Sequence, residues 1–220
     1  MPTASESIYC ITLLRHGESE GNAADLIQGQ SDYPLTARGI EQARTLAARW
    51  QILQARSDRP LFETIITSPL TRACQTAEIV ATVLNLPLEL DSIWIERGFG
   101  NLDGRPLDEI LDLNPPVDFH HPYKPPGEGG ESSVDLFLRA SQALRGVMQR
   151  PAGRYLIVSH GAILNMVVYA ILGITPHGHY NSPRFSFGNT AFANFTYNAV
   201  TRRWHLLNFE NPDDPMSNQR

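Results

Sequence analysis

The sequence has only two cysteines, no internal repeat and no surplus of positive charge, and these absences narrow what the protein can be. Cys10 and Cys74 are too few for the disulfide framework of a small secreted domain. No apolar run reaches the roughly 20 residues of a membrane-spanning helix, and the first residues lack the basic and apolar stretches of a signal peptide. A net charge of −5 gives no general attraction for nucleic acid or an anionic membrane. We therefore expect a cytoplasmic protein that binds anions only through local groups of arginine.

The 220 residues, 42% of them hydrophobic, suit one large domain in which strands alternate with helices. Short apolar runs predict buried strands at residues 9–14, 64–67, 88–95 and 155–158. Predicted helices run from an N-cap at Thr36 to about residue 56, from Ser68-Pro69 to 84, and over 106–113, 132–150 and 161–172, before a hairpin at 191–198 and 203–209. This order predicts an α/β fold, a three-layer sandwich with a mostly parallel sheet flanked by helices. We expect one domain over 1–220, with a cap-like insertion at about 101–131.

Basic and imidazole side chains follow the ends of three predicted strands. Arg15-His16 comes after the first, Arg72 soon after the second, and His160-Gly161 after the last of the buried strands. Because ligands bind beyond the carboxyl ends of parallel strands, we expect these groups to meet at one edge of the sheet. Together they are suited to holding a phosphate against an imidazole.

The chemistry predicted for this edge is phosphoryl transfer. An imidazole held through one nitrogen can attack phosphorus through the other and form a phosphohistidine. Arg15 and Arg72 offer planar donor forks for the phosphate oxygens, and Glu96 can protonate the leaving alkoxide. A protonated His160 would add a charge and a donor. Further donors for the phosphate are expected from Ser19, Asn22, Gln28 and the helix-terminal amides of Gly161 and Ala162.

Four segments carry a resemblance to a known family: Leu14–Ser19 with Asn22, Ser68–Ala73 with Gln75–Ala77, Glu96–Gly100, and Val158–Gly161. They resemble the histidine phosphatase superfamily, also called the phosphoglycerate mutase-like family. The resemblance implies the phosphoglycerate mutase-like fold, with His16 as the phosphorylated nucleophile and Glu96 as the acid and base. It also implies a phosphate pocket of Arg15, Arg72 and His160 with auxiliary contacts from Asn22 and Gln28, and it implies no metal and no cofactor.

Within that family the sequence favours a phosphatase over a cofactor-dependent mutase. The mutases carry two adjacent arginines in the insertion for the substrate carboxylate, and residues 97–131 contain no such pair. Phe99 stands where the mutases usually have Tyr, and residues 126–132 resemble the family's small phosphomonoesterases. We expect a metal-independent phosphoric monoester hydrolase acting on a small phosphorylated metabolite. A cofactor-dependent phosphoglycerate mutase is the alternative.

The insertion is also the predicted substrate end of the site, with Arg97 and Phe99 as candidate contacts. Its seven carboxylates argue against a substrate with many negative charges beyond its phosphate. Phe99, Phe119 and Tyr123 can pack against an apolar or sugar-like leaving group, and they equally suit a core of the insertion itself. Whether Arg97 faces a ligand or the solvent stays open.

Other classes of protein have less support. A metallohydrolase built on His120-His121 or on His177 and His179 is disfavoured, because neither pair has the spacing of a shared helical ligand face. A non-catalytic protein-binding relative is disfavoured because every expected catalytic residue is present. The expected partner is a small-molecule phosphoester, with no nucleic acid and no membrane. A homodimer stays open, because the C-terminal hairpin either presents an edge for pairing or is covered.

Overall fold

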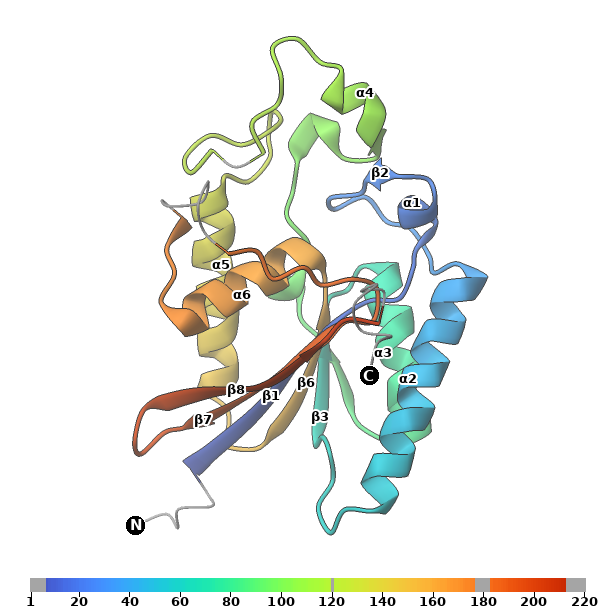
Figure 1. Cartoon of the computed structure of the whole chain (residues 1–220), viewed down its shortest axis with the longest axis vertical. Helices are drawn as coiled ribbons and strands as arrows, with labels where there is room; N and C mark the ends of the chain where they lie inside the picture. Colours follow the sequence, from blue (N-terminus) through green and yellow to red (C-terminus); the bar gives the residue numbers. More distant parts are fainter. Residues whose placement is uncertain (1–6, 120, 177–182, 213–220) are drawn as a thin grey trace.

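A six-stranded sheet forms the centre of the protein, in the order β4-β3-β6-β1-β7-β8 (Figure 1). The computed structural model describes residues 7–119, 121–176 and 183–212. The strands are β1 (Ile8–Arg15), β3 (Thr64–Thr67), β4 (Leu88–Leu90), β6 (Arg154–Ser159), β7 (Phe192–Asn198) and β8 (Arg203–Glu210). The first four run parallel, and β7 and β8 form an antiparallel hairpin beside β1. The predicted mostly parallel sheet and terminal hairpin are confirmed.

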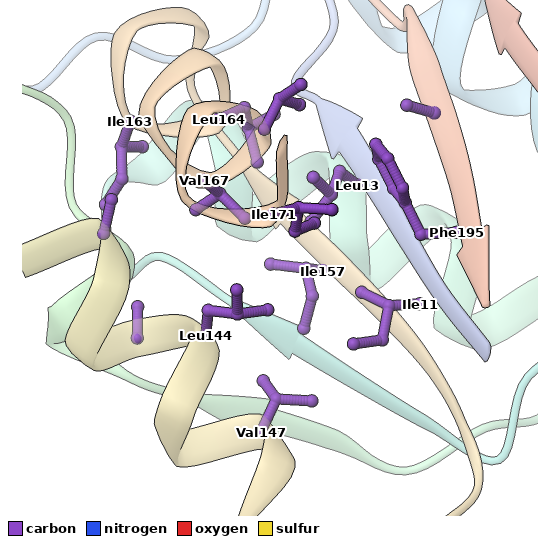
Figure 2. Packing of buried hydrophobic residues seen from close by; sticks show 14 of the residues in the cluster. Ile11, Leu13, Leu144, Val147, Ile157, Ile163, Leu164, Val167, Ile171 and Phe195 are labelled. Atoms are coloured by element: carbon purple, nitrogen blue, oxygen red, sulfur yellow. The ribbon is translucent and has the colours of Figure 1, made fainter. Parts of the chain in front are cut away.

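Helices cover both faces of this sheet (Figure 1). On one side are α2 (Ala37–Ala55) and α3 (Thr71–Leu84), and on the other α5 (Ser133–Met148) and α6 (Gly161–Leu172). Because neighbouring strand residues point to opposite faces, Ile65 and Ile66 join different buried clusters. Figure 2 shows the cluster under α5 and α6, where Ile157 of β6 packs near Leu144 and Val167. The three-layer sandwich is therefore confirmed. In the described ranges no helix is long and apolar enough to span a membrane.

Two of three predicted helix starts agree with the structure, and Thr36 is the N-cap that was predicted. Thr36 caps α2 by accepting a hydrogen bond from the Gly39 amide, and Ser132 caps α5 in a reciprocal capping box. For α3, the predicted start at Ser68-Pro69 is two residues too early, because the helix begins at Thr71. The carboxylate of Asp32, distant in the sequence, accepts the Thr71 amide at 2.7 Å and fixes that start.

The strand predicted over 88–95 is also shorter than expected, since β4 ends at Leu90. The Asp91 side chain accepts the amide of Ile93 at 3.0 Å and begins a 3₁₀ turn over Ser92–Trp94. The carbonyl of the buried Trp94 accepts the hydroxyl of Ser159 at 2.6 Å. This turn, instead of a longer strand, leads the chain to Glu96 at the edge of the sheet.

Smaller elements lie above the carboxyl ends of the parallel strands (Figure 1). They are α1 (Glu20–Ala23), β2 (Leu26–Ile27), β5 (Arg105–Pro106) and α4 (Leu107–Leu111), and β2 pairs with β5. The two ends of the 101–131 segment are joined, because the Glu131 amide donates to the Gly98 carbonyl at 2.7 Å. Gly100 has φ +65°, and a Cβ there would collide with the carbonyl of Glu128. The close approach of these ends therefore requires glycine.

Candidate active site

A cavity of about 370 Å³ opens above the carboxyl ends of the parallel strands. One part of its lining, called here the polar wall, consists of Arg15, His16, Asn22, Gln28, Arg72 and Glu96. A second part, the apolar wall, consists of Leu26, Ile27, Phe99, Leu107 and Phe119. Gly29 and the exposed Arg184 also line the cavity. Six residues predicted for phosphate binding or catalysis, from separate segments of the chain, thus meet in one wall.

His16 directly follows β1, and only 2% of its surface is exposed. Its amide donates to the Ser159 carbonyl of β6 at 3.0 Å, which fixes the backbone. Nδ1 lies 2.6 Å from the carbonyl of Gly17. Because a carbonyl can only accept, the hydrogen is on Nδ1 and Nε2 keeps its lone pair. Burial, followed by the charges of Arg15 and Arg72, lowers the pKa of His16 well below its ordinary value and favours the neutral ring.

His160 is fully buried at the start of α6, with its ring centroid 5.1 Å from that of His16. Its Nε2 lies 2.8 Å from the Ser68 hydroxyl oxygen, which itself accepts the Leu70 amide at 3.3 Å. Ser68 can therefore donate its hydroxyl hydrogen bond to Nε2 of His160. In that arrangement the ring hydrogen of the neutral His160 lies on Nδ1. Nδ1 has no hydrogen-bond partner within the described residues. A buried unpaired donor costs about 1–3 kcal/mol, and an anion beside the ring would remove that cost.

A positive charge on His160, which would require a protonated ring, is not favoured by the surroundings of this histidine. Burial lowers the pKa of His160 well below its ordinary value, and the nearby His16, Arg72 and Arg15 act in the same direction. The neutral imidazole is therefore the favoured form. As a neutral ring, His160 can contribute a hydrogen-bond donor and no charge.

Arg15 and Arg72 are held in place by backbone carbonyls. Arg72, only 1% exposed, donates to the carbonyls of Gly29 and Ser31, each at 2.8 Å, and its Nε has no partner within the described ranges. Arg15 donates to the carbonyl of Phe187 at 2.7 Å. Neutral carbonyls orient both guanidinium groups without cancelling their charge. The polar wall therefore contains two fixed positive charges, which suits a phosphate dianion.

Ser19 orients the two side-chain amides of the polar wall. The Asn22 Oδ1 accepts the Ser19 amide at 3.2 Å, and the Ser19 hydroxyl lies 2.9 Å from that oxygen and 2.7 Å from the Gln28 Oε1. With the two oxygens engaged, the NH₂ groups of Asn22 and Gln28 point away from Ser19. Ser19 is fully buried and is not part of the cavity lining. Its predicted contact with phosphate stays a prediction, while its contacts are those of an orienting group.

Glu96 faces the first turn of α6. One carboxylate oxygen accepts the amide of Ala162 and the other the amide of Ile163, both at 3.2 Å. These are amides that a helix N-terminus leaves without internal partners. The Ala162 amide, predicted to bind phosphate, is therefore engaged by Glu96 in this structure. Gly161 lies beside Arg15, because a Cβ on it would stand 3.8 Å from the Nε of that arginine.

Arg139 of α5 connects the Glu96 loop to the end of the insertion, and sequence reasoning missed it. Its guanidinium donates to the carbonyls of Ile95 at 2.6 Å and Glu96 at 3.1 Å. It also donates to both carboxylate oxygens of Glu131, at 2.8 and 2.7 Å. The signal available in the sequence is spacing, since Arg139 comes three residues after the buried Leu136 and so lies on the covered face of the helix.

Arg97 is not part of the cavity lining, and its predicted contact with substrate stays a prediction. The side chain is 5% exposed and donates twice to the carbonyl of Glu131 and once, at 2.7 Å, to the carbonyl of Phe119. Its guanidinium carbon also lies 5.3 Å from the centre of the Phe99 ring. Its donors are engaged by backbone, so Arg97 holds the insertion in shape.

The aromatic residues of the insertion are divided between the cavity and the solvent. Phe99 and Phe119 line the cavity and also contact each other edge to face at 6.0 Å, so they serve both as wall and as local core. Tyr123 is 64% exposed and does not line the cavity. Sequence reasoning missed the aliphatic members of the apolar wall, which lie on short elements without periodicity: Leu26, Ile27 and Leu107.

The expected acidic rim is absent from the cavity lining that the structure describes. None of the seven carboxylates of the insertion belongs to it. Glu131, for example, is bound by Arg139. Among the described lining residues Glu96 is the one carboxylate, against the three arginines Arg15, Arg72 and Arg184. The hypothesis that these carboxylates disfavour further negative charge on the substrate stays a prediction. Arg184 is a lining residue that sequence reasoning missed.

The histidines considered as metal ligands fall largely outside the described residues, which leave out His120, His177 and His179. Nδ1 of His121 accepts the amides of Tyr123 and Lys124 at 3.1 and 3.0 Å. Across the described ranges, no three His, Cys, Asp or Glu side chains gather as a metal site requires.

Comparison with known proteins identifies the family. A family model described as "Histidine phosphatase superfamily (branch 1)" matches residues 11–210. The chain belongs to the histidine phosphatase superfamily. The chain is 37% identical over 174 residues to a "Probable phosphoglycerate mutase GpmB" of Enterobacter sp. (strain 638), covering 74% of this chain and 75% of the relative. A relative of the same name from Photorhabdus laumondii is 39% identical over 171 residues, covering 76% of each chain.

Among solved structures, the chain is similar to a phosphoserine phosphatase of Entamoeba histolytica in complex with 3-phosphoglyceric acid. That likeness has a TM-score of 0.74 and 26% identity, and covers 93% of this chain and 98% of the other. YhfR of Bacillus stearothermophilus gives a TM-score of 0.77 and 27% identity, over 90% and 95% of the two chains. The phosphoglycerate mutase-like fold is thus confirmed, whereas the names divide between mutase and phosphatase.

Proposed function

We propose that this histidine phosphatase is a metal-independent phosphomonoesterase that acts through a phosphohistidine on a small phosphorylated metabolite. The observation that carries the proposal is the state of His16. Its Nδ1 hydrogen is bound by the Gly17 carbonyl, its ring is favoured in the neutral form, and it lines a cavity beside two fixed arginines. A neutral imidazole with one nitrogen held is ready to use the other as a nucleophile.

In the first step, Nε2 of His16 attacks the phosphorus and the bond from phosphorus to the ester oxygen breaks. Arg15 and Arg72 hold the three phosphoryl oxygens, on which the charge is spread in the transition state. Nδ1 of His160 and the amides of Asn22 and Gln28 supply neutral donors. Glu96 gives its proton to the leaving alkoxide, so the alcohol departs uncharged.

In the second step, water attacks the phosphohistidine and inorganic phosphate leaves. Glu96, now a carboxylate, takes a proton from the attacking water while the P–N bond breaks and His16 is restored. Arg139 and the first amides of α6 hold Glu96 in place for both transfers. The 101–131 segment acts as a cap, and the apolar wall receives the leaving group. We place the reaction in the cytoplasm, with a small-molecule phosphoester as the partner.

A cofactor-dependent phosphoglycerate mutase is the second candidate, and the names of the curated relatives favour it. A mutase must hold the phosphohistidine long enough to return the group to a reoriented sugar acid. The insertion has no adjacent arginine pair, and Arg97 is engaged by backbone carbonyls. These two observations support hydrolysis over the mutase reaction.

The test is a parallel assay of the purified protein with a chelator present. One arm measures phosphate release from a broad panel of phosphomonoesters. The other measures interconversion of 3- and 2-phosphoglycerate primed with 2,3-bisphosphoglycerate. We expect phosphate release that is insensitive to the chelator, little interconversion, and no release by His16→Ala.

Two outcomes would overturn the proposal. Fast interconversion with little release would make the protein a mutase. Release that disappears with the chelator and returns with added metal would contradict metal independence. His205→Gln, a substitution of an exposed histidine on β8, is the matched control and should keep the wild-type rates.

A further inference from the structure

The peptide unit between Gly29 and Gln30 is hydrogen-bonded on both sides to charged side chains. Its carbonyl oxygen accepts Nη2 of Arg72 at 2.8 Å. Its amide, on Gln30, donates to Oδ2 of Asp103 at 3.1 Å. A single peptide group therefore connects a carboxylate of the insertion to a buried arginine of the polar wall. The proposed reaction uses Arg72 and assigns no role to Asp103.

The carboxylate of Asp103 is held in one position against Gly29. Oδ1 accepts the amide of Phe99 at 2.9 Å, so each carboxylate oxygen has one backbone donor, as the ionised form allows. Oδ1 also lies only 1.7 Å from the place that a Cβ on Gly29 would take. The next amide, of Gly104, donates to the carbonyl of Ile27 at 2.7 Å. The backbone around Asp103 is therefore attached to the same loop as its side chain.

Asp103 selects the orientation of the peptide unit. Gly29 has φ +50°, and glycine has conformations open to it that would turn the following peptide over. The turned peptide would direct its carbonyl oxygen at the Asp103 carboxylate, where two acceptors repel each other, and would withdraw that oxygen from Arg72. The hydrogen bond from the Gln30 amide to the carboxylate therefore favours the orientation in which the carbonyl faces Arg72.

The same hydrogen bond strengthens the contact of the peptide with Arg72. A carboxylate that accepts an amide hydrogen polarises the peptide group, and the polarised carbonyl is a better acceptor for a guanidinium. The plane of the guanidinium is fixed by two such acceptors, the carbonyls of Gly29 and Ser31, each at 2.8 Å. Loss of one acceptor would leave the guanidinium free to turn about the other.

We propose that Asp103 is a positioning residue, which orients the guanidinium of Arg72 for phosphate through the peptide unit between Gly29 and Gln30. This inference rests on the proposed function, in which Arg72 holds the phosphoryl oxygens. Asp103 is not part of the cavity lining, so it acts through Arg72 and takes no part in the covalent steps. The insertion then contributes to the phosphate pocket as well as to the apolar wall.

The experiment replaces Asp103 by asparagine, which keeps the size of the side chain but puts an NH₂ group against one of the two backbone amides. Asp112→Asn is the matched control, since Asp112 is an exposed aspartate at the end of α4 in the same insertion. We measure kcat/KM for glycerol 3-phosphate and 4-nitrophenyl phosphate, and the Kd of inorganic phosphate by calorimetry. Urea unfolding shows that each variant is folded under the assay conditions.

Asp103→Asn should lower kcat/KM about 10-fold and should weaken the binding of inorganic phosphate about 3- to 10-fold, as the loss of a hydrogen bond to a charged group allows. The loss of kcat/KM should be equal for the alkyl and the aryl ester, because phosphate contacts change and proton transfer does not. Asp112→Asn should keep the wild-type values.

Two results with Asp103→Asn would overturn the proposal. Lower stability with unchanged kcat/KM and unchanged phosphate binding would limit Asp103 to a structural role. A clearly larger loss for the alkyl ester would show that the variant acts through Glu96, whose carbonyl accepts the side chain of Gln30 at 3.1 Å.

A second variant tests whether the effect passes through Arg72. Arg72→Lys keeps the positive charge but has no planar group to orient. In that background Asp103→Asn should change the Kd of inorganic phosphate little, whereas in the wild-type background it should weaken binding. Equal effects in the two backgrounds would contradict the proposed route through Arg72.

The binding measurements separate this inference from the proposed function. If the wild type hydrolyses no phosphomonoester, the proposed function fails. The Kd values of inorganic phosphate for wild type, the two single variants and the double variant then still decide the role of Asp103. If hydrolysis occurs and phosphate binding does not depend on Asp103, only the inference fails.

Discussion

The polar and apolar walls of the cavity are built in opposite ways. The polar wall comes largely from the ends of strands and the starts of helices, and its side chains are fixed by backbone carbonyls and amides. The apolar wall comes from short elements above the sheet, and Leu107 in it is 39% exposed. In the proposed reaction, the edge of the sheet supplies the groups for phosphate, and the short elements above it supply the groups for the rest of the substrate. Changes in the two walls should therefore have different kinetic effects.

The largest effect is expected from removing the nucleophile of the polar wall. His16→Ala should lower kcat by at least about 10³-fold for every substrate, because no other group can form the covalent intermediate. Steady-state phosphate release measures this loss, and circular dichroism checks the fold. A substantial residual rate would show direct attack by water and would reject the phosphohistidine.

Replacing Glu96 separates two contributions of the polar wall, the binding of phosphate and the transfer of a proton. Glu96→Gln should lower kcat about 10²- to 10³-fold for alkyl phosphates. The loss should be clearly smaller for an aryl phosphate, whose leaving group needs less protonation. Rates for glycerol 3-phosphate and 4-nitrophenyl phosphate in wild type and variant give the comparison. Equal losses with the two substrates would contradict the acid role.

Replacing Arg139 tests whether the position of Glu96 affects kcat when its carboxyl group is left intact. Arg139→Gln should lower kcat about 10-fold, because the loop that carries Glu96 loses its fixed donor. It should also lower the free energy of unfolding by about 2 kcal/mol, since Glu131 is left without its partner. A positioning role predicts that alkyl phosphates lose more than aryl phosphates, as for Glu96→Gln. A loss of stability with unchanged kcat would show that Arg139 stabilises the fold and has no role in positioning Glu96. The control is Arg145→Gln, on the exposed side of α5.

The buried histidines of the site should make stability depend on pH. The pKa of His16 and of His160 is lowered in the folded protein, while in the unfolded chain each takes up a proton near pH 6.5. Their cost to folding is therefore small above pH 6.5 and grows as the pH falls, by about 1 kcal/mol per histidine between pH 7.5 and 5.5. Urea unfolding at the two pH values measures this difference. His160→Gln should reduce this pH-dependent difference in unfolding free energy. An undiminished difference in that variant would contradict the lowered pKa of His160. The control His205→Gln, at an exposed position, should leave the difference unchanged.

The smallest effect is expected from the apolar wall. Phe119→Ala should raise KM about 3- to 10-fold for substrates with a bulky leaving group and should change kcat little, because the ring contacts only the part of the substrate that does not react. Substrates of increasing leaving-group size give the measurement. A large fall in kcat would show that the apolar wall also shapes the polar one.

The sequence allowed the polar wall to be predicted and left most of the apolar wall unpredicted, for a physical reason. His16, Arg72 and Glu96 follow strands or turns whose ends must converge at one edge of a parallel sheet. Leu26 and Leu107 lie in short elements without periodicity, so only the folded chain shows that they meet. Arg184 was not predicted for the same reason, because it belongs to an irregular segment.

The errors in element ends have a related cause. The end of β4 and the start of α3 are each decided by one aspartate side chain, Asp91 and Asp32. Asp91 acts on an amide two residues away and could have been read as a local cap. Asp32 lies 39 positions before the amide that it accepts, and no local pattern reveals such a partner.

The pairing of β1 also sets the time at which the protein becomes active. Its neighbours in the sheet are β6 and β7, so Arg15 pairs with Ser159, about 140 residues later in the chain. At ordinary rates of synthesis, roughly 10 to 30 s pass on the ribosome before that partner emerges. Until then β1 lacks both of its neighbours in the sheet, and the segment that carries His16 has no sheet to hold it. The proposed catalysis therefore requires that most of the chain has left the ribosome.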